Sequence, residues 1–205
     1  MQHVISNRIS DFKKIYRKNV ELVSISHSTS DHLTRLAGRL FSSHKTLELK
    51  WRQKATDKDS PTRELRVSIE DNEAIGSLTK EIVRTNEILY ELFDCKEISI
   101  RVTTLSKPMC PKFHVDAIAC RMLTTISGGG TEWISRDDVD ESVLANRWLD
   151  TAPLKTGKEI RQLKTSAMSL LKGGSWQEGF EGVVHRSPHQ SSERLLLSYD
   201  PIFSD

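Results

Sequence analysis

Two residues in the second half of the chain have the side-chain types and the spacing that metal binding requires. His114 and Asp116 stand two apart in the segment Cys-Pro-Lys-Phe-His-Val-Asp at 110–116. Residues two apart on a β-strand point to the same face, so an imidazole nitrogen and a carboxylate oxygen would project together. This pattern allows a metal site, and a histidine that hydrogen-bonds to the aspartate without a metal is the alternative.

A second segment supplies two further groups. His185 lies in the segment Gly-Val-Val-His-Arg-Ser-Pro at 182–188, and Arg194 follows it nine residues later. If a strand brings His185 next to the first pair, two histidines and one carboxylate form the facial ligand set of non-haem Fe(II) oxygenases, which leaves coordination positions open. An arginine on the following strand would offer two parallel donors to a carboxylate. Together these groups imply an acidic cosubstrate that chelates the metal.

The order of these residues resembles the 2-oxoglutarate- and Fe(II)-dependent dioxygenase superfamily. The spacing of His185, Pro188 and Arg194 is similar to that of its prolyl-hydroxylase-type members, and the resemblance covers about residues 97–200. It implies an α+β fold in which N-terminal helices precede a double-stranded β-helix, the jelly-roll or cupin-like core of that superfamily.

The resemblance also implies roles for these residues. His114, Asp116 and His185 would bind Fe(II) and so form the catalytic centre, and Arg194 would bind the distal carboxylate of 2-oxoglutarate. The activity implied is the hydroxylation of a substrate, with release of succinate and carbon dioxide. The substrate, a small molecule or a peptide, is not identified by the sequence.

The sequence departs from the superfamily pattern after the arginine. Many members carry a hydroxyl residue two positions later, where this chain has Leu196. Ser198 or Tyr199 would have to take that place.

Arg121 is a second candidate for binding the cosubstrate. It lies five residues after Asp116, on what we expect to be one strand from about 113 to 125. Strict alternation would put the two side chains on opposite faces, so a β-bulge would be needed to turn Arg121 inward. An exposed arginine paired with a carboxylate is the alternative interpretation.

The chain as a whole resembles an uncharacterised family of small bacterial proteins, a domain of unknown function. This resemblance is carried by Cys-Pro-x-Phe-His-x-Asp at 110–116, Gly-Gly-Gly-Thr-Glu-Trp at 128–133 and His-Arg-Ser-Pro at 185–188. It brings no established activity with it.

Two sections of different periodicity make up the single domain that we expect over residues 1–205. Residues 1–95 are predicted to be mainly helical, because apolar residues recur at helical spacing after Ser30 and again over 71–93. A strand is possible over 64–69. From residue 96 to 205 the pattern is that of a β-core. The expected strands are 97–104, 113–125, 131–134, 166–171, 182–185 and one around 195–197, with a turn at 128–130 and one helix within 137–149.

Composition narrows the class of protein. The 205 residues are 37% hydrophobic and 28% charged, which suits one globular domain and excludes a disordered, collagen-like or membrane-embedded chain. The net charge of +2 gives no indication of nucleic-acid binding. No signal-peptide pattern or membrane-spanning run is present, and the three cysteines form no Cys-x-x-Cys pair, so we expect a cytoplasmic protein. A homodimer is possible.

Two other functions use the same residues. A non-catalytic protein that binds or senses zinc or iron could hold its metal through two histidines and an aspartate. A metal-dependent hydrolase would need a general base, and no convincing candidate accompanies the three ligands. Arg194 discriminates between the first two hypotheses, because a metal store has no need of a positioned guanidinium.

Overall fold

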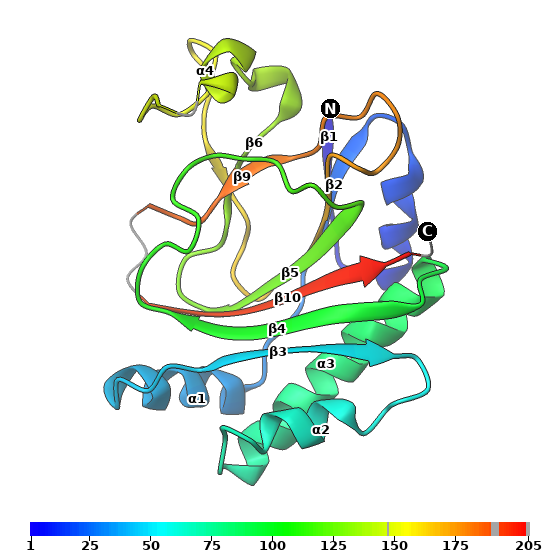
Figure 1. Cartoon of the computed structure of the whole chain (residues 1–205), viewed down its shortest axis with the longest axis vertical. Helices are drawn as coiled ribbons and strands as arrows, with labels where there is room; N and C mark the ends of the chain where they lie inside the picture. Colours follow the sequence, from blue (N-terminus) through cyan, green and yellow to red (C-terminus); the bar gives the residue numbers. More distant parts are fainter. Residues whose placement is uncertain (147, 190–192, 204–205) are drawn as a thin grey trace.

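The computed structural model describes residues 1–146, 148–189 and 193–203 as two β-sheets with helices on the outside. Figure 1 shows α1, α2 and α3 on one side of the larger sheet, and the small sheet with α4 on the other. In chain order the elements are β1 (Gln2–Ser6), the 3-10 helix η1 (Ile9–Tyr16), β2 (Val20–Ile25), α1 (Asp31–Ser42), β3 (Glu48–Lys54), α2 (Ser60–Leu65), α3 (Asn72–Leu92), β4 (Glu97–Leu105), β5 (Cys120–Ser127), β6 (Glu132–Ile134), the 3-10 helix η2 (Arg136–Asp138), α4 (Glu141–Ala145), β7 (Arg161–Gln162), β8 (Met168–Lys172), β9 (Val184–Arg186) and β10 (Arg194–Ile202).

The strands of the second half alternate between the two sheets. The large sheet has the order β1-β2-β8-β5-β10-β4-β3, and the small sheet has the order β7-β6-β9. An antiparallel bridge between His114 and His185 adds the segment before β5 to the free side of β9. From β4 onward the chain therefore passes to the small sheet and back three times. The last strand, β10, lies inside the large sheet between β5 and β4.

The alternation of β10 separates two cores. Leu195, Leu197 and Tyr199 are fully buried in the large core, together with residues of α1, α2 and α3. Leu196 points the other way and packs in a smaller cluster that includes Trp133 of the small sheet. Because residues two apart share a face, Arg194 and Ser198 lie on the same side of β10 as Leu196, facing the small sheet.

The N-terminal section differs from its predicted character. The two amphipathic helices are confirmed as α1 and α3, which begin after the capping residues Ser30 and Asp71. The section also contains β1, β2 and β3, which form both edges of the large sheet. A strand over 64–69 is wrong, because α2 and the turn after it occupy this segment and the amide of Ile69 donates to the carbonyl oxygen of Leu65.

The strand predicted over 113–125 is confirmed only from residue 120 onward. His114 bridges to the small sheet, whereas β5 begins at Cys120 in the large sheet, so the chain crosses between the sheets in this segment. The crossing packs closely on Gly173 and Gly174. The amide of Gly173 donates to the carbonyl oxygen of Ala119, and that of Gly174 donates to the carbonyl oxygen of Asp116. A Cβ on Gly173 would lie 2.0 Å from the carbonyl oxygen of Ile118. The other predicted strands of the β-core are confirmed as β4, β6, β8, β9 and β10, and the predicted helix within 137–149 is α4.

Candidate metal centre

The crossing segment and β9 bring the three predicted metal ligands together. One donor atom from each of His114, Asp116 and His185 lies within 4.8 Å of the others. Oδ2 of Asp116 is 3.3 Å from Nε2 of His185, and Oδ1 is 3.7 Å from Nε2 of His114. The two imidazole rings have their centroids 4.6 Å apart. Two imidazoles and one carboxylate thus converge on one point.

Backbone contacts fix the orientation of both rings. The amide of His114 donates to the carbonyl oxygen of His185 at 3.0 Å, and the amide of His185 donates to the carbonyl oxygen of His114 at 2.9 Å. Nδ1 of His114 is 2.9 Å from the carbonyl oxygen of Lys112, and Nδ1 of His185 is 3.0 Å from that of Val183. A carbonyl oxygen only accepts, so each Nδ1 carries the proton and donates it. This is the arrangement that orients metal-binding histidines.

The remaining nitrogens face a carboxylate. With Nδ1 protonated, the neutral rings of His114 and His185 present lone pairs on Nε2 toward Asp116. Lone pairs and a carboxylate repel each other unless a proton or a metal ion lies between them. The donor set therefore fits a divalent cation such as Fe(II) or Zn(II).

Electrostatics keep the carboxylate ionised. Burial alone would raise the pKa of Asp116, but the neighbouring His185 and the charge of Arg121 outweigh burial and lower the pKa to about 2. Burial lowers the pKa of His114 below its usual value. Both shifts favour the protonation states in which a carboxylate and an imidazole bind metal.

Arg121 lies beside this centre and not on the opposite face. Its Nη1 donates to Oδ2 of Asp116 at 2.7 Å, and its Nε and Nη2 donate to the two oxygens of Asp200 at 2.6 and 2.8 Å. The alternation argument was wrong because Asp116 belongs to the crossing and Arg121 to β5. No bulge is needed, and the guanidinium is already engaged by two carboxylates.

Arg194 lies at the start of β10 with a different environment. Its residue is 2% exposed, and its Nη2 is 3.3 Å from Oγ1 of Thr131 and 3.5 Å from Oγ1 of Thr125. Its Nε has no hydrogen-bond partner among the residues that the structure describes. Burial lowers the pKa of Arg194 to about 10, where the guanidinium is still charged at neutral pH.

The predicted glycine turn explains how Arg194 is enclosed. Gly128 has a φ of +86°, and a Cβ there would lie 2.1 Å from the carbonyl oxygen of Glu193 and 2.8 Å from Cγ of Arg194. Only a residue without a side chain lets the turn lie directly on this part of β10.

The two hydroxyl candidates on β10 have separate positions. Ser198 shares the inward face with Arg194, whereas Tyr199 points into the helix side of the large sheet and is fully buried there. The hydroxyls that contact Arg194 are those of Thr125 and Thr131, which the sequence reasoning missed. The period-two spacing from Trp133 back to Thr131 was a usable signal, because it puts both side chains on one face.

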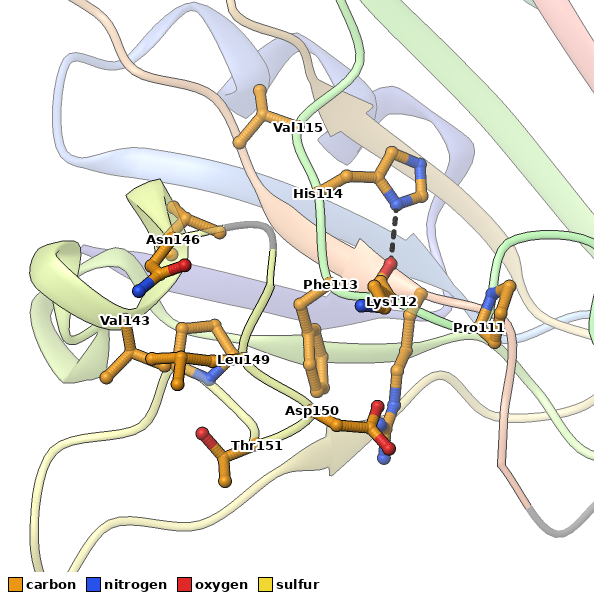
Figure 2. Close-up of a pocket in the computed structure, with 13 residues that line it drawn as sticks. Pro111, Lys112, Phe113, His114, Val115, Val143, Asn146, Leu149, Asp150 and Thr151 are labelled. Carbon is orange, nitrogen blue, oxygen red and sulfur yellow. Dashed lines mark hydrogen bonds between the residues drawn. The ribbon is translucent and has the colours of Figure 1, made fainter.

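A cavity of about 400 Å³ lies next to this centre, on the back of the strand that carries His114. Figure 2 shows the rings of Phe113 and His114 turned to different sides of the backbone, with Val143 and Leu149 across the cavity from Phe113. Phe113, His114 and Val115 all line the cavity. The cavity therefore borders the metal donors on the side of His114.

None of the described helices is both long enough and apolar enough to cross a membrane.

Solved structures share this fold at low sequence identity. The dioxygenase for auxin oxidation from rice is similar with a TM-score of 0.61 and 10% identity, over 98% of this chain and 83% of that one. The dioxygenase for auxin oxidation 1 from Arabidopsis thaliana, solved with 2-oxoglutarate, gives 0.59 and 9%, over 100% and 93%. A prolyl-4-hydroxylase from Pseudomonas putida gives 0.52 and 7%, over 97% and 100%. The protein thus has the mixed α/β jelly-roll fold of these dioxygenases.

Sequence comparison gives a family but no activity. No curated protein matches the chain. Residues 6–200 match the family described as a protein of unknown function, DUF1826. That match spans nearly the whole sequence, and the chain therefore belongs to the DUF1826 family.

Proposed function

We propose that this protein is an Fe(II)- and 2-oxoglutarate-dependent oxygenase built on a double-stranded β-helix. The alternation of strands between the sheets supports that core: β4, β5, β8 and β10 in the large sheet, and the His114 segment, β6, β7 and β9 in the small one. The fold shared with dioxygenases supports the same conclusion, and the site supplies the chemistry.

One observation carries the proposal: Arg194 is a buried positive charge without a carboxylate partner in the described part of the chain. Removing an unpaired charge from water costs several kcal/mol. A protein that keeps such a group on the face of β10 turned toward the small sheet, which carries His185 in β9, has a place for an anion. A metal store or metal sensor would have no use for it.

The residues would divide the work between them. His114, Asp116 and His185 would hold iron, and Arg194 would pair with the far carboxylate of 2-oxoglutarate through its two parallel N–H groups. Iron and 2-oxoglutarate bound there would supply the oxidation of a substrate C–H bond by dioxygen, with succinate and carbon dioxide as the other products. His185 and Arg194 are both buried, which would keep water away from the reacting groups.

The hydroxyls near Arg194 would complete its site. Thr125 and Thr131 accept from Nη2 and hold the guanidinium in place. They would supply the hydroxyl groups that Leu196 lacks. Ser198, on the same face of β10 and 8% exposed, remains a further hydroxyl for the cosubstrate. The substrate would be a small molecule or a peptide.

The proposal is tested by anaerobic reconstitution of the full chain with Fe(II) and 2-oxoglutarate. We expect the weak visible charge-transfer band of a chelated 2-oxo acid, and we expect His114→Ala to abolish it. Arg194→Ala should raise the 2-oxoglutarate concentration needed by about tenfold or more, because a charge-assisted pair is lost, with Arg194→Lys between the two. Arg186→Ala, which removes an arginine on the other face of β9 from His185, should behave as the wild type.

The opposite result separates the two functions. A protein that binds one metal ion through His114 but gives no band with 2-oxoglutarate is a metal-binding or metal-sensing protein. In that case retention of zinc in preference to iron would be the next measurement.

A further inference from the structure

Arg121 connects the Asp116 carboxylate to the last strand of the large sheet. Its Nη1 donates to Oδ2 of Asp116, while Nε and Nη2 donate to both oxygens of Asp200. The two parallel bonds to Asp200 fix the plane and the position of the guanidinium. One N–H of an immobilised group is therefore directed at one oxygen of Asp116.

This arrangement is built into the sheet and partly shielded from water. Tyr199 pairs with Met122, so Asp200 and Arg121 follow as neighbours on adjacent strands. The side chains of Asp116, Arg121 and Asp200 are 16%, 22% and 21% exposed. Ion pairs with this much shielding hold their geometry better than pairs on an open surface.

The backbone of Asp116 is held as firmly as its side chain. Its carbonyl oxygen accepts from the amide of Gly174 at 2.9 Å. Gly182, with a φ of +78°, packs against Val115, the residue before Asp116. A Cβ on Gly182 would lie 2.3 Å from Cγ1 of Val115. These contacts restrict the Asp116 carboxylate to one main position for binding a metal ion.

We propose that Arg121, held by Asp200, is a positioning residue that makes Asp116 a one-oxygen metal ligand. Arg121 occupies Oδ2, which leaves Oδ1 as the oxygen for the metal. A carboxylate that binds through one oxygen fills one coordination position instead of two, and the position saved is available to a chelating cosubstrate. This inference rests on the metal site of the proposed function.

A competing role for Arg121, as the group that binds the cosubstrate carboxylate, fits the geometry less well. Nε and Nη2 of Arg121 already bind Asp200 and its Nη1 already binds Asp116, so all three nitrogens are engaged before an incoming carboxylate arrives. Arg194 offers the opposite environment.

The test is a Co(II) titration of the metal-free full chain, followed by the visible absorption of Co(II), which reports coordination number without any turnover. We expect Arg121→Gln to change the intensity of the Co(II) bands as Asp116 binds through both oxygens, and to weaken Co(II) binding by about 10- to 100-fold. Arg121→Lys, which keeps the charge, should restore part of both. The matched control is Arg186→Gln, which breaks a 2.7 Å pair of similar burial with Glu132 beside His185 and should leave both unchanged.

Two further variants keep the test decisive if Arg121→Gln folds poorly. Asp200→Asn retains the contact with Asp116 but loosens the guanidinium, so we expect a smaller change in the same direction. The double variant Arg121→Gln/Asp200→Asn leaves one fewer unpaired carboxylate and should show the full spectral change. Wild-type bands and affinity in the folded double variant would overturn the positioning role alone. Failure of the wild type to bind Co(II) through His114 would overturn the metal site itself.

Discussion

Buried charge is treated in opposite ways at two places on the inner face of β10. Near its end, Asp200 and Asp116 enclose Arg121 with three short hydrogen bonds. Six residues earlier, Arg194 has only two threonine hydroxyls at 3.3 and 3.5 Å. Paired charges hold a geometry before any ligand arrives, whereas an unpaired charge is satisfied only by the ligand. The proposed metal donors are thus held in place without a ligand, whereas under the proposed function Arg194 would gain a charged partner only when 2-oxoglutarate binds.

The largest expected effect comes from breaking the paired end. Arg121→Met should lower the free energy of unfolding of the metal-free protein by about 3 kcal/mol, because two partly buried carboxylates lose their counter-charge. Urea unfolding at pH 7 measures this directly. A loss below about 1 kcal/mol would mean that water replaces the guanidinium without penalty, and the two ends would then be alike.

A smaller effect on stability is expected at His3, a titratable side chain that stays neutral in the folded protein at pH 7. His3 packs edge-on against Trp133, with ring centroids 5.1 Å apart, and its Nε2 is 2.8 Å from the hydroxyl of Ser24. Burial, followed by the charge of Arg161, lowers the pKa of His3 to about 4.

The sign of the resulting pH dependence follows from proton binding. Between pH 6.5 and about 4 the unfolded chain binds a proton at His3 that the folded chain does not, so the free energy of unfolding falls as the pH falls through this window. The loss attributable to His3 is about 2 kcal/mol, and it is absent above pH 6.5. Urea unfolding of the wild type and His3→Gln at pH 7 and pH 4.5 checks it. Equal pH dependence in the two proteins would contradict the assignment.

The smallest effect on stability is expected at the unpaired end. Arg194→Met removes a buried charge that has no carboxylate partner in the described residues, so the free energy of unfolding should stay within about 1 kcal/mol of the wild type or rise. The same unfolding curves that show the Arg121→Met loss provide the measurement. A loss as large as that of Arg121→Met would remove the difference between the two ends.

The sequence was informative about the site because the site depends on residue identity and order. His114, Asp116, His185 and Arg194 were proposed from their types and spacing, which also resemble a dioxygenase pattern, and the structure brings the first three together. The network of Arg121 was not found. Apolar residues alternate in the same way whether a segment stays in one sheet or crosses to another. The pattern of apolar residues therefore does not indicate that the chain changes sheets after Asp116.

The fold was less readable in the N-terminal section for a related reason. All six residues of β2 are buried, including Glu21 and Ser24, so the strand shows no alternation of apolar and polar residues. A strand covered on both faces does not reveal its period. The amphipathic α1 and α3 have one exposed face and were predicted correctly.

The central position of β10 has a consequence for how the chain folds during its synthesis. Until residue 202 has been made, β4 and β5 have no strand between them, and each presents an unpaired edge to other nascent chains. Arg194 and Asp200 arrive on this same strand. Closure of the sheet, protection of its edges and assembly of both charge environments therefore all wait for the synthesis of β10.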